Sequence, residues 1–262
     1  MPRQSWTECE TEQLKALYQK ADVEELLAVL PKRSIVSIYK KAMTAGLKRN
    51  LSTVRKKYSM DTDFFDTASD QSDYWAGFIA ADGNIRSNKP CVRIKISAMD
   101  ISHLQLFQKQ SGSTSPIKTI NISENKKYVY TEVHGACKWC ECLLQTYNIG
   151  PKKSLSYQSP NLELRRAMVF LKGYIDGDGC MHKGKTPGQD RFVLCGNMEF
   201  LMWARSEVYK YFGLETCMPR TLTPNTYQWA INGTKARLFC SLMSDLTPLG
   251  MTRKWDKFNE KI

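Results

Sequence analysis

Residues 75–83, WAGFIAADG, and residues 171–179, LKGYIDGDG, are two versions of one nine-residue pattern. Each copy is an apolar stretch rich in small residues that ends in an Asp followed by a Gly, and the acids are Asp82 and Asp178. The pattern predicts two helices with a carboxylate at the C-terminal end of each. We therefore expect the fold to present one carboxylate twice, in pseudosymmetric positions.

Small residues recur four positions apart in both copies. They are Gly77 and Ala81 in the first copy, and Gly173 and Gly177 in the second. Residues with this spacing lie on one face of a helix, and faces without bulk can approach backbone to backbone. Such a contact would place Asp82 beside Asp178. Gly83 and Gly179 are predicted to end the helices, at a position where φ is often positive.

The predicted pair of acids is electrostatically unfavourable in isolation. A carboxylate at a helix C-terminus opposes the helix dipole, and two neighbouring carboxylates repel one another. Exposed helix-end acids without a role are the simpler alternative. The repetition of the arrangement favours a bound divalent cation, and oxygen-only ligands suit Mg²⁺ or a related ion such as Mn²⁺.

From residue 74 onward the hydrophobic periodicity predicts the same order of elements twice. After the helix ending at Asp82, the first copy has a strand at 91–97, a helix at 101–109, strands at 116–123 and 126–134, and a helix at 136–147. After the helix ending at Asp178, the second has a strand at 191–196, a helix at 198–212, strands at 216–222 and 226–233, and a helix at 234–244. Each half is expected to have the order α-β-β-α-β-β-α, an α+β fold, and the segments above include three of the four strands of each half.

The two nonapeptides and this order of elements resemble the single-chain LAGLIDADG homing endonucleases, over about residues 74–262. The resemblance implies two pseudosymmetric halves, 74–152 and 153–262, whose antiparallel sheets form a DNA-binding saddle. It also implies that Asp82 and Asp178 are catalytic metal ligands, assisted by the carbonyls of Ala81 and Gly177. The implied activity is a metal-dependent double-strand break in a long pseudo-palindromic DNA site.

Two positions depart from the pattern of that family. The sixth motif residue is often Asp, but here it is Ala80 in one copy and Asp176 in the other. The family also tends to place a basic or polar residue near the end of the last strand of each half, where this chain has Glu132 and Asn232. Neither residue is basic, so the supporting role is unassigned.

Basic and polar residues repeat in the expected hairpins of both halves. Arg93 and Lys95 alternate with apolar residues in one strand, which predicts one exposed and one buried face. A twisted sheet with such a face suits the major groove of DNA. For each residue the alternative is an ordinary solvated charge. The candidate contacts are Arg86, Arg93, Lys95, Lys118, Lys126, Lys127, Lys183, Lys185, Arg191, Arg220 and Gln228.

The first 49 residues predict a separate three-helix domain. Thr7 with Glu10 and Asp22 with Glu25 have the spacing of capping boxes, and Pro31 precedes a third, basic helix. This layout is typical of a helix-turn-helix DNA-binding domain. The candidate contacts are Lys32, Arg33, Lys40 and Lys41. A solvated helical face or a protein-interaction module is the alternative. Residues 50–73, basic and then acidic and Ser/Thr-rich, are predicted to be a linker.

Bulk composition agrees with a nucleic-acid partner. The 262 residues include 38 Lys and Arg against 26 Asp and Glu, a net charge of +12. Residues 1–58 carry +6 and the remaining 204 carry the other +6, so the front of the chain is the more densely basic. No stretch approaches the roughly 20 apolar residues of a membrane span, and no signal-peptide pattern is present, so we expect an intracellular protein.

The nine cysteines are expected to be reduced thiols. Cys137, Cys140 and Cys142 lie close together, but their segment has the pattern of a helix packed on the core, which we prefer to a zinc site. The sequence thus predicts a monomeric, Mg²⁺-dependent homing endonuclease for double-stranded DNA. The alternative is a DNA-binding regulator or an intron RNA maturase that uses the same fold without cleavage.

Overall fold

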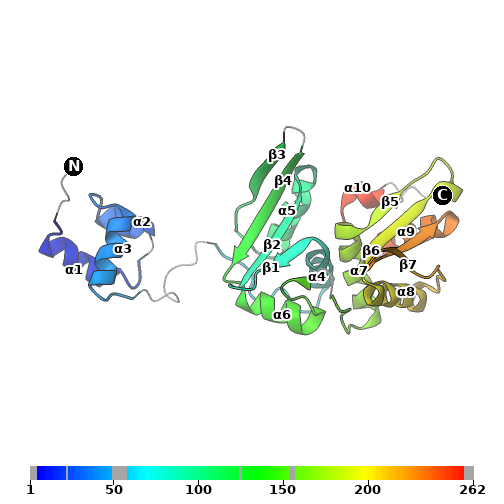
Figure 1. Cartoon of the computed structure of the whole chain (residues 1–262), viewed down its shortest axis with the longest axis horizontal. Helices are drawn as coiled ribbons and strands as arrows, with labels where there is room; N and C mark the ends of the chain where they lie inside the picture. Colours follow the sequence, from blue (N-terminus) through cyan, green and yellow to red (C-terminus); the bar gives the residue numbers. More distant parts are fainter. Residues whose placement is uncertain (1–4, 22, 49–57, 124–125, 154–156, 257–262) are drawn as a thin grey trace. The chain divides into compact units, whose positions relative to one another are not determined.

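The structure, a computed structural model, describes residues 5–21, 23–48, 58–123, 126–153 and 157–256. The chain divides into two compact units, Met1–Tyr58 and Ser59–Ile262 (Figure 1). No helix in the described ranges is long and apolar enough to cross a bilayer.

The first unit contains the three expected helices, α1 (Glu8–Leu17), α2 (Val23–Val29) and α3 (Ile35–Thr44). Their core includes Leu14, Leu26, Ile38 and Ala42, none of which is more than 1% exposed. The predicted capping box at the start of α1 is present, since Thr7 and Glu10 bond each other's backbone N–H groups. The second predicted box begins at Asp22, outside the described residues.

The second unit begins earlier than the sequence indicated. Of the expected linker, residues 50–57 lie outside the described ranges, but the part from Ser59 onward is packed rather than linking. Phe64 and Phe65 are 6% and 2% exposed, and the ring of Phe65 meets that of Trp139 edge-on at 5.2 Å. The acidic, Ser/Thr-rich composition hid these two aromatic anchors, because apolar burial outweighs the polarity of the residues around them.

The expected repeat of elements is present in the second unit. The first half comprises α4 (Asp70–Asp82), β1 (Gly83–Ile85), β2 (Cys91–Ser97), η1 (Ala98–Asp100), α5 (Ile101–Gln110), β3 (Lys118–Ser123), β4 (Lys126–His134) and α6 (Cys137–Tyr147). The second comprises α7 (Leu164–Asp178), β5 (Cys180–His182), η3 (Pro187–Gln189), β6 (Arg191–Gly196), α8 (Met198–Phe212), β7 (Arg220–Thr223), β8 (Thr226–Asn232), α9 (Thr234–Asp245) and α10 (Thr252–Trp255).

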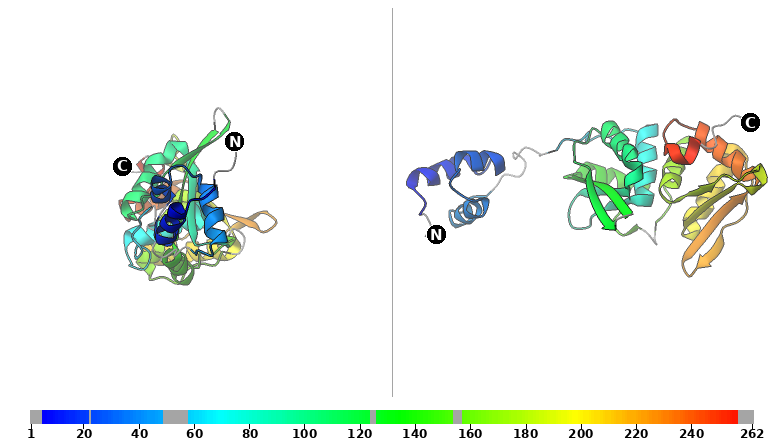
Figure 2. Two further views of the ribbon diagram at one scale, coloured as in Figure 1. Left: turned by 90° about the vertical axis from the view of Figure 1, so that its left-hand side faces the viewer. Right: turned by 90° about the horizontal axis from the view of Figure 1, so that it is seen from above.

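Each half forms a four-stranded antiparallel sheet with the same topology. The strand orders are β1-β2-β4-β3 and β5-β6-β8-β7, so the fold class is α+β as predicted. The short strand β1 follows directly after Asp82, and β5 begins two residues after Asp178. Helices α4 and α7 lie between the two sheets in two different views (Figures 1 and 2).

Alternation along the strands separates a buried face from an exposed face. In β2, Val92, Ile94 and Ile96 are buried against the core, whereas Lys95 is exposed. In β6 and β8 the buried positions are Phe192, Leu194, Trp229 and Ile231. The polar faces of both sheets are therefore left open for contact with a partner.

Candidate functional site

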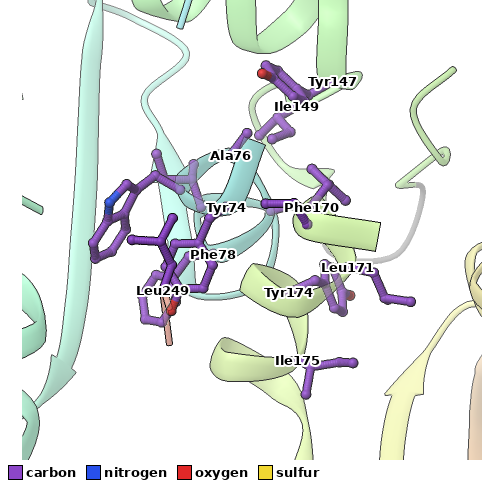
Figure 3. Close-up of a cluster of buried hydrophobic side chains, with 14 of the residues drawn as sticks. Tyr74, Ala76, Phe78, Tyr147, Ile149, Phe170, Leu171, Tyr174, Ile175 and Leu249 are labelled. Atoms are coloured by element: carbon purple, nitrogen blue, oxygen red, sulfur yellow. The ribbon is translucent and has the colours of Figure 1, made fainter. Parts of the chain in front are cut away.

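Helices α4 and α7 meet backbone to backbone through glycine. A Cβ atom built on Gly77 would lie 1.9 Å from the carbonyl oxygen of Phe170, and one built on Gly173 would lie 1.9 Å from that of Tyr74. A Cβ on Gly177 would lie 2.4 Å from the Cβ of Ala81. The structure thus places all four expected small residues at the helix contact. Figure 3 shows the buried side chains around it.

The two helices end in the same way. Asp82 and Asp178 are the last helical residues, and the C-cap residues Gly83 and Gly179 that follow have φ of −84° and −78°. The expected positive φ is therefore wrong. Glycine is required for space instead: a Cβ on Gly83 would lie 2.7 Å from the Cα of Ile79, and one on Gly179 would lie 2.6 Å from the oxygen of Ile175. The chain turns into the sheet directly over the last helical turn.

The acids at the two helix ends lie close to each other. Both side chains are exposed, and a Cβ on Gly177 would lie 3.5 Å from the carboxyl carbon of Asp82. The surrounding protein, and secondarily the charge of Asp178, raise the pKa of Asp82 to about 6. Partial desolvation by the protein atoms around it also raises the pKa of Asp178. A pair whose charged forms are disfavoured in this way is a natural place for a cation.

Two lysines flank the pair in equivalent positions. Lys153 Nζ donates a hydrogen bond to the carbonyl oxygen of Gly83 at 2.5 Å, and Lys254 Nζ donates to that of Gly179 at 2.8 Å. Burial lowers the pKa of both lysines, and both lower the pKa of the two aspartates by charge attraction. Each lysine thus supports the C-terminal end of one motif helix.

Sequence reasoning missed these lysines. It looked for a supporting residue near Glu132 and Asn232, but each lysine lies in the segment after the last long helix of its half. A faint signal was available, because residues 150–153 (GPKK) and 250–254 (GMTRK) each place a basic pair shortly after a glycine. Their approach to the motif helices depends on the path of the chain, which local sequence does not encode.

Asp176 has a structural position, away from the pair of aspartates. It is 1% exposed and accepts hydrogen bonds from Tyr74 Oη at 2.6 Å, Trp255 Nε1 at 2.7 Å and the N–H of Met251 at 2.9 Å. The corresponding residue of the other copy, Ala80, is buried without a polar group. The difference at the sixth motif position is therefore an asymmetry of packing.

The exposed face of the first sheet combines cations with tyrosines. The guanidinium carbon of Arg93 lies 4.5 Å from the ring centre of Tyr130, and Lys95 Nζ lies 4.7 Å from that of Tyr128. Lys126 Nζ also approaches Tyr128, at 5.8 Å. Cation–π contacts of this kind orient flexible basic side chains on the face.

Arg86 is part of a cluster in which one acid is shared by several basic side chains. It forms an ion pair with Glu132, which also lies 3.9 Å from Arg93 Nε and 3.6 Å from His134 Nε2. Arg93 Nε is a buried nitrogen without a hydrogen-bond partner in the described ranges. Glu132 therefore compensates basic charge, which sets Arg86 apart from the freely exposed candidates.

The remaining sheet candidates are mostly at the surface. Arg220 Nη2 donates to Gln228 Oε1 at 3.1 Å on neighbouring strands, which couples two of them. Lys183 and Gln228 are half-buried. The exposed candidates are Lys95, Lys118, Lys126, Lys127, Lys185, Arg191 and Arg220.

One candidate of the first unit has a different place from the one predicted. Arg33 is 8% exposed and binds Glu10 through two hydrogen bonds of 2.9 and 2.6 Å, so it stabilises the unit from within. The basic pattern that marked it as a surface contact does not reveal this partner, which precedes it by 23 positions. Lys32 and Lys40 are exposed, and Lys41 is half-buried.

The cysteine cluster is part of a packed helix. Cys137, Cys140 and Cys142 lie on α6, where Cys142 is buried beside Trp139. Trp139 Nε1 donates to the carbonyl of Asp61 at 2.7 Å, which joins α6 to the start of the unit. No group of three or more His, Cys, Asp and Glu side chains is placed to hold a metal in the described part of the chain.

The sequence matches no protein-family model and no curated protein. Among solved structures, the chain is similar to the LAGLIDADG meganuclease I-AabMI bound to uncleaved DNA, with 13% identity over 73% of this chain and 89% of that chain and a TM-score of 0.48. It is also similar to the meganuclease I-SmaMI bound to uncleavable DNA, with 10% identity over 73% of this chain and 87% of that chain and a TM-score of 0.49. A third similar structure is the N-terminal LAGLIDADG domain of WhiA, with 15% identity over 76% of this chain and 93% of that chain and a TM-score of 0.48.

At these identities and TM-scores the similarity by itself carries no conclusion about this chain. The chain itself has two motif helices in backbone contact, each followed by a four-stranded antiparallel sheet. Residues 59–262 therefore contain the two equivalent α+β halves that the sequence predicted.

Proposed function

We propose that this protein is a site-specific endonuclease that hydrolyses both strands of a double-stranded DNA site with the help of a divalent cation. The observation that carries the proposal is the convergence of Asp82 and Asp178 at two contacting helix ends, each flanked by a lysine. Acids at paired helix C-termini are costly in the folded chain unless a cation compensates them.

The available donor atoms fit a hard cation. The two carboxylates and the backbone carbonyls of Ala81 and Gly177 offer only oxygen, which suits Mg²⁺ and Mn²⁺ better than softer metals. When bound, the cation supplies an activated water and stabilisation of the leaving oxygen. The raised pKa of Asp82, about 6, means that its charged, cation-binding form is fully populated only above that pH.

The two lysines provide fixed positive charge at the same place. Lys254 Nζ donates to three carbonyl oxygens, those of Ile175, Asp176 and Gly179, at 2.6 to 3.1 Å. Its ammonium group is therefore a fixed positive charge at the end of α7, near Asp178. Lys153 is less buried and bonds one carbonyl in the described ranges, so its ammonium group has the capacity to donate to a phosphate oxygen as negative charge develops.

Recognition of DNA is assigned to the exposed faces of the two sheets. Arg93 and Lys95 are held over tyrosine rings on one face, and Arg220 with Gln228 lies on the second sheet. Arginine, lysine and glutamine are the side chains that read guanine and adenine edges in the major groove. Since both half-sites would be read by one chain, the protein is proposed to act as a monomer.

Cleavage of a DNA library tests the proposal. A pool of randomised duplexes is incubated with the protein in Mg²⁺, in Mn²⁺ and in EDTA, and the ends produced are sequenced. Asp82→Asn and Asp178→Asn remove one charge each, and Glu141→Gln, an exposed acid on α6, is the matched control. The proposal expects double-strand ends from wild type and control with either metal, and none from the Asp variants.

The opposite results have clear meanings. Binding without ends in any sample would refute cleavage and favour a DNA-binding regulator or an RNA maturase built on the same fold. Ends that persist in both Asp variants would place the catalytic centre elsewhere.

A further inference from the structure

Charge is segregated within the first unit. Five of its six acidic residues lie on α1 and α2, whereas residues 26–58 contain no Asp or Glu and nine Lys or Arg. The sixth acid, Asp22, is outside the described residues. α3 is the helix inside this basic stretch, and it carries Lys40 and Lys41 without an acidic residue.

One face of α3 is polar along its length. Ser37, Lys40, Lys41 and Thr44 have the spacing i, i+3, i+4 and i+7, which places them on one side of the helix. The opposite side packs into the core through Ile38 and Ala42, both 0% exposed. The polar face is therefore turned outward by the burial of the other face.

This face lines a hollow of about 770 Å³, together with Lys32 and Ser34 from the preceding turn. Its lining includes ammonium and hydroxyl groups, which proteins use as donors to phosphate oxygens, beside the apolar side chains of Trp6 and Val36. Lys41 Nζ lies 5.8 Å from the ring centre of Trp6, which limits the directions that this lysine can take. The hollow thus presents the ammonium groups of Lys32, Lys40 and Lys41 on one side of the unit.

Arg33 keeps the nearby acid from cancelling this charge. Its guanidinium binds Glu10 through two hydrogen bonds and donates a third to the carbonyl of Ser5 at 2.6 Å. The pairing lowers the pKa of Glu10 to about 2, so this acid is charged and already compensated. The charge of Glu10 is therefore paired with Arg33, and no acidic residue is among the described residues that line the hollow.

We propose that the polar face of α3 with its hollow is a second nucleic-acid surface, which holds the phosphate backbone of double-stranded DNA beside the site gripped by the sheets. The proposal rests on the proposed function, because DNA is taken as the polyanion on the ground that one duplex would be bound by both units. It assigns the contact to Lys32, Lys40 and Lys41 and gives Arg33 an internal role. A protein partner is disfavoured because the charged residues that the structure describes along the hollow are all basic and include three lysines, a residue type depleted at protein interfaces.

The test measures how the affinity of the full chain for a duplex of about 40 base pairs depends on salt. Binding is followed by fluorescence anisotropy in EDTA, so that the result is independent of cleavage. The test variant is Lys32→Ala/Lys40→Ala, in which both side chains are exposed. The control is Lys15→Ala/Lys20→Ala, which removes the same charge from exposed positions on and just after α1.

Loss of two phosphate contacts reduces the slope of log affinity against log salt by about 1.8, so that the affinity lost between about 50 and about 200 mM salt shrinks about tenfold. We expect this change in the test variant and no change in the control. Lys40→Glu, a single charge reversal, should weaken binding further at low salt. Equal slopes for test variant and wild type, or equal changes in test variant and control, would overturn the proposal.

These outcomes are distinguishable from a failure of the nuclease assignment. A protein that cuts no DNA but shows the slope change keeps the second surface and loses the nuclease. A protein that cuts DNA with unchanged slopes keeps the nuclease and loses the second surface. Capture of a protein by α3 without a slope change would likewise refute the DNA surface.

Discussion

Replacement of Gly173 by Ala tests the packing on which the site depends. The added methyl group would lie 1.9 Å from the carbonyl oxygen of Tyr74, a backbone atom on the facing helix that no side-chain rotation can remove. Relief requires the two helices to separate by more than about 1 Å, and a gap of 0.5–1 Å already costs about a quarter to a half of the dispersion energy at the contact.

The magnitude follows from two opposing effects. Overpacking costs about 1–3 kcal/mol, and the rigid backbone neighbour favours the upper end of that range. Alanine regains about 1 kcal/mol of helix propensity over glycine. The net loss in the free energy of unfolding is therefore about 2 kcal/mol, accompanied by a displacement of Asp178 relative to Asp82 that would reduce cleavage by about 100-fold.

Urea unfolding followed by circular dichroism measures the stability, and the library-derived DNA site measures the cleavage. Gly188→Ala is the matched control, because a Cβ there meets nothing within 4 Å and its φ is not positive. If Gly173→Ala were as stable and as active as this control, the two helices would not be in backbone contact, and the reasoning would be refuted.

Three further predictions concern groups around the helix contact. Lys254→Met should lower the free energy of unfolding by about 2 kcal/mol, because three carbonyl oxygens lose a buried donor, and thermal unfolding beside Lys254→Arg would reveal it. Burial lowers the pKa of His103 to about 4, so the unfolded chain binds more protons than the folded chain between about pH 6.5 and pH 4. The free energy of unfolding should therefore fall by up to about 3 kcal/mol as the pH falls through that window. Urea titrations at several pH values should show this dependence in the wild type and not in His103→Gln. Arg253→Ala removes two hydrogen bonds, of 2.6 and 2.9 Å, to the 7%-exposed Asp100 of the first half, and hydrogen exchange should then speed up at α10 while β6 stays protected.

The repeated pattern made much of the second unit predictable. Alternation in residues 91–97 anticipated β2, and the periodicity of residues 198–212 anticipated α8. Both are dictated by local periodicity, which the sequence carries directly. Strands β1 and β5 have only three residues each, so alternation of apolar and polar residues could not reveal them in the sequence.

What the sequence did not reveal depends on contacts between distant segments. Lys153 and Lys254 reach the motif helices from residues far along the chain, and Arg33 is taken up by Glu10. Gly83 has a negative φ, and glycine is needed there because a Cβ would meet Ile79, not because of a helix-stop preference. Such features are determined by tertiary packing, which local patterns do not encode.

The most direct measurement is a crystal structure of the protein with Mn²⁺ and a DNA duplex, with anomalous diffraction used to locate the metal. The account predicts anomalous density within ligand distance, about 2.2 Å, of carboxylate oxygens from both Asp82 and Asp178, beside a phosphate. Density at another place, or carboxyl groups of residues 82 and 178 that face apart, would contradict it.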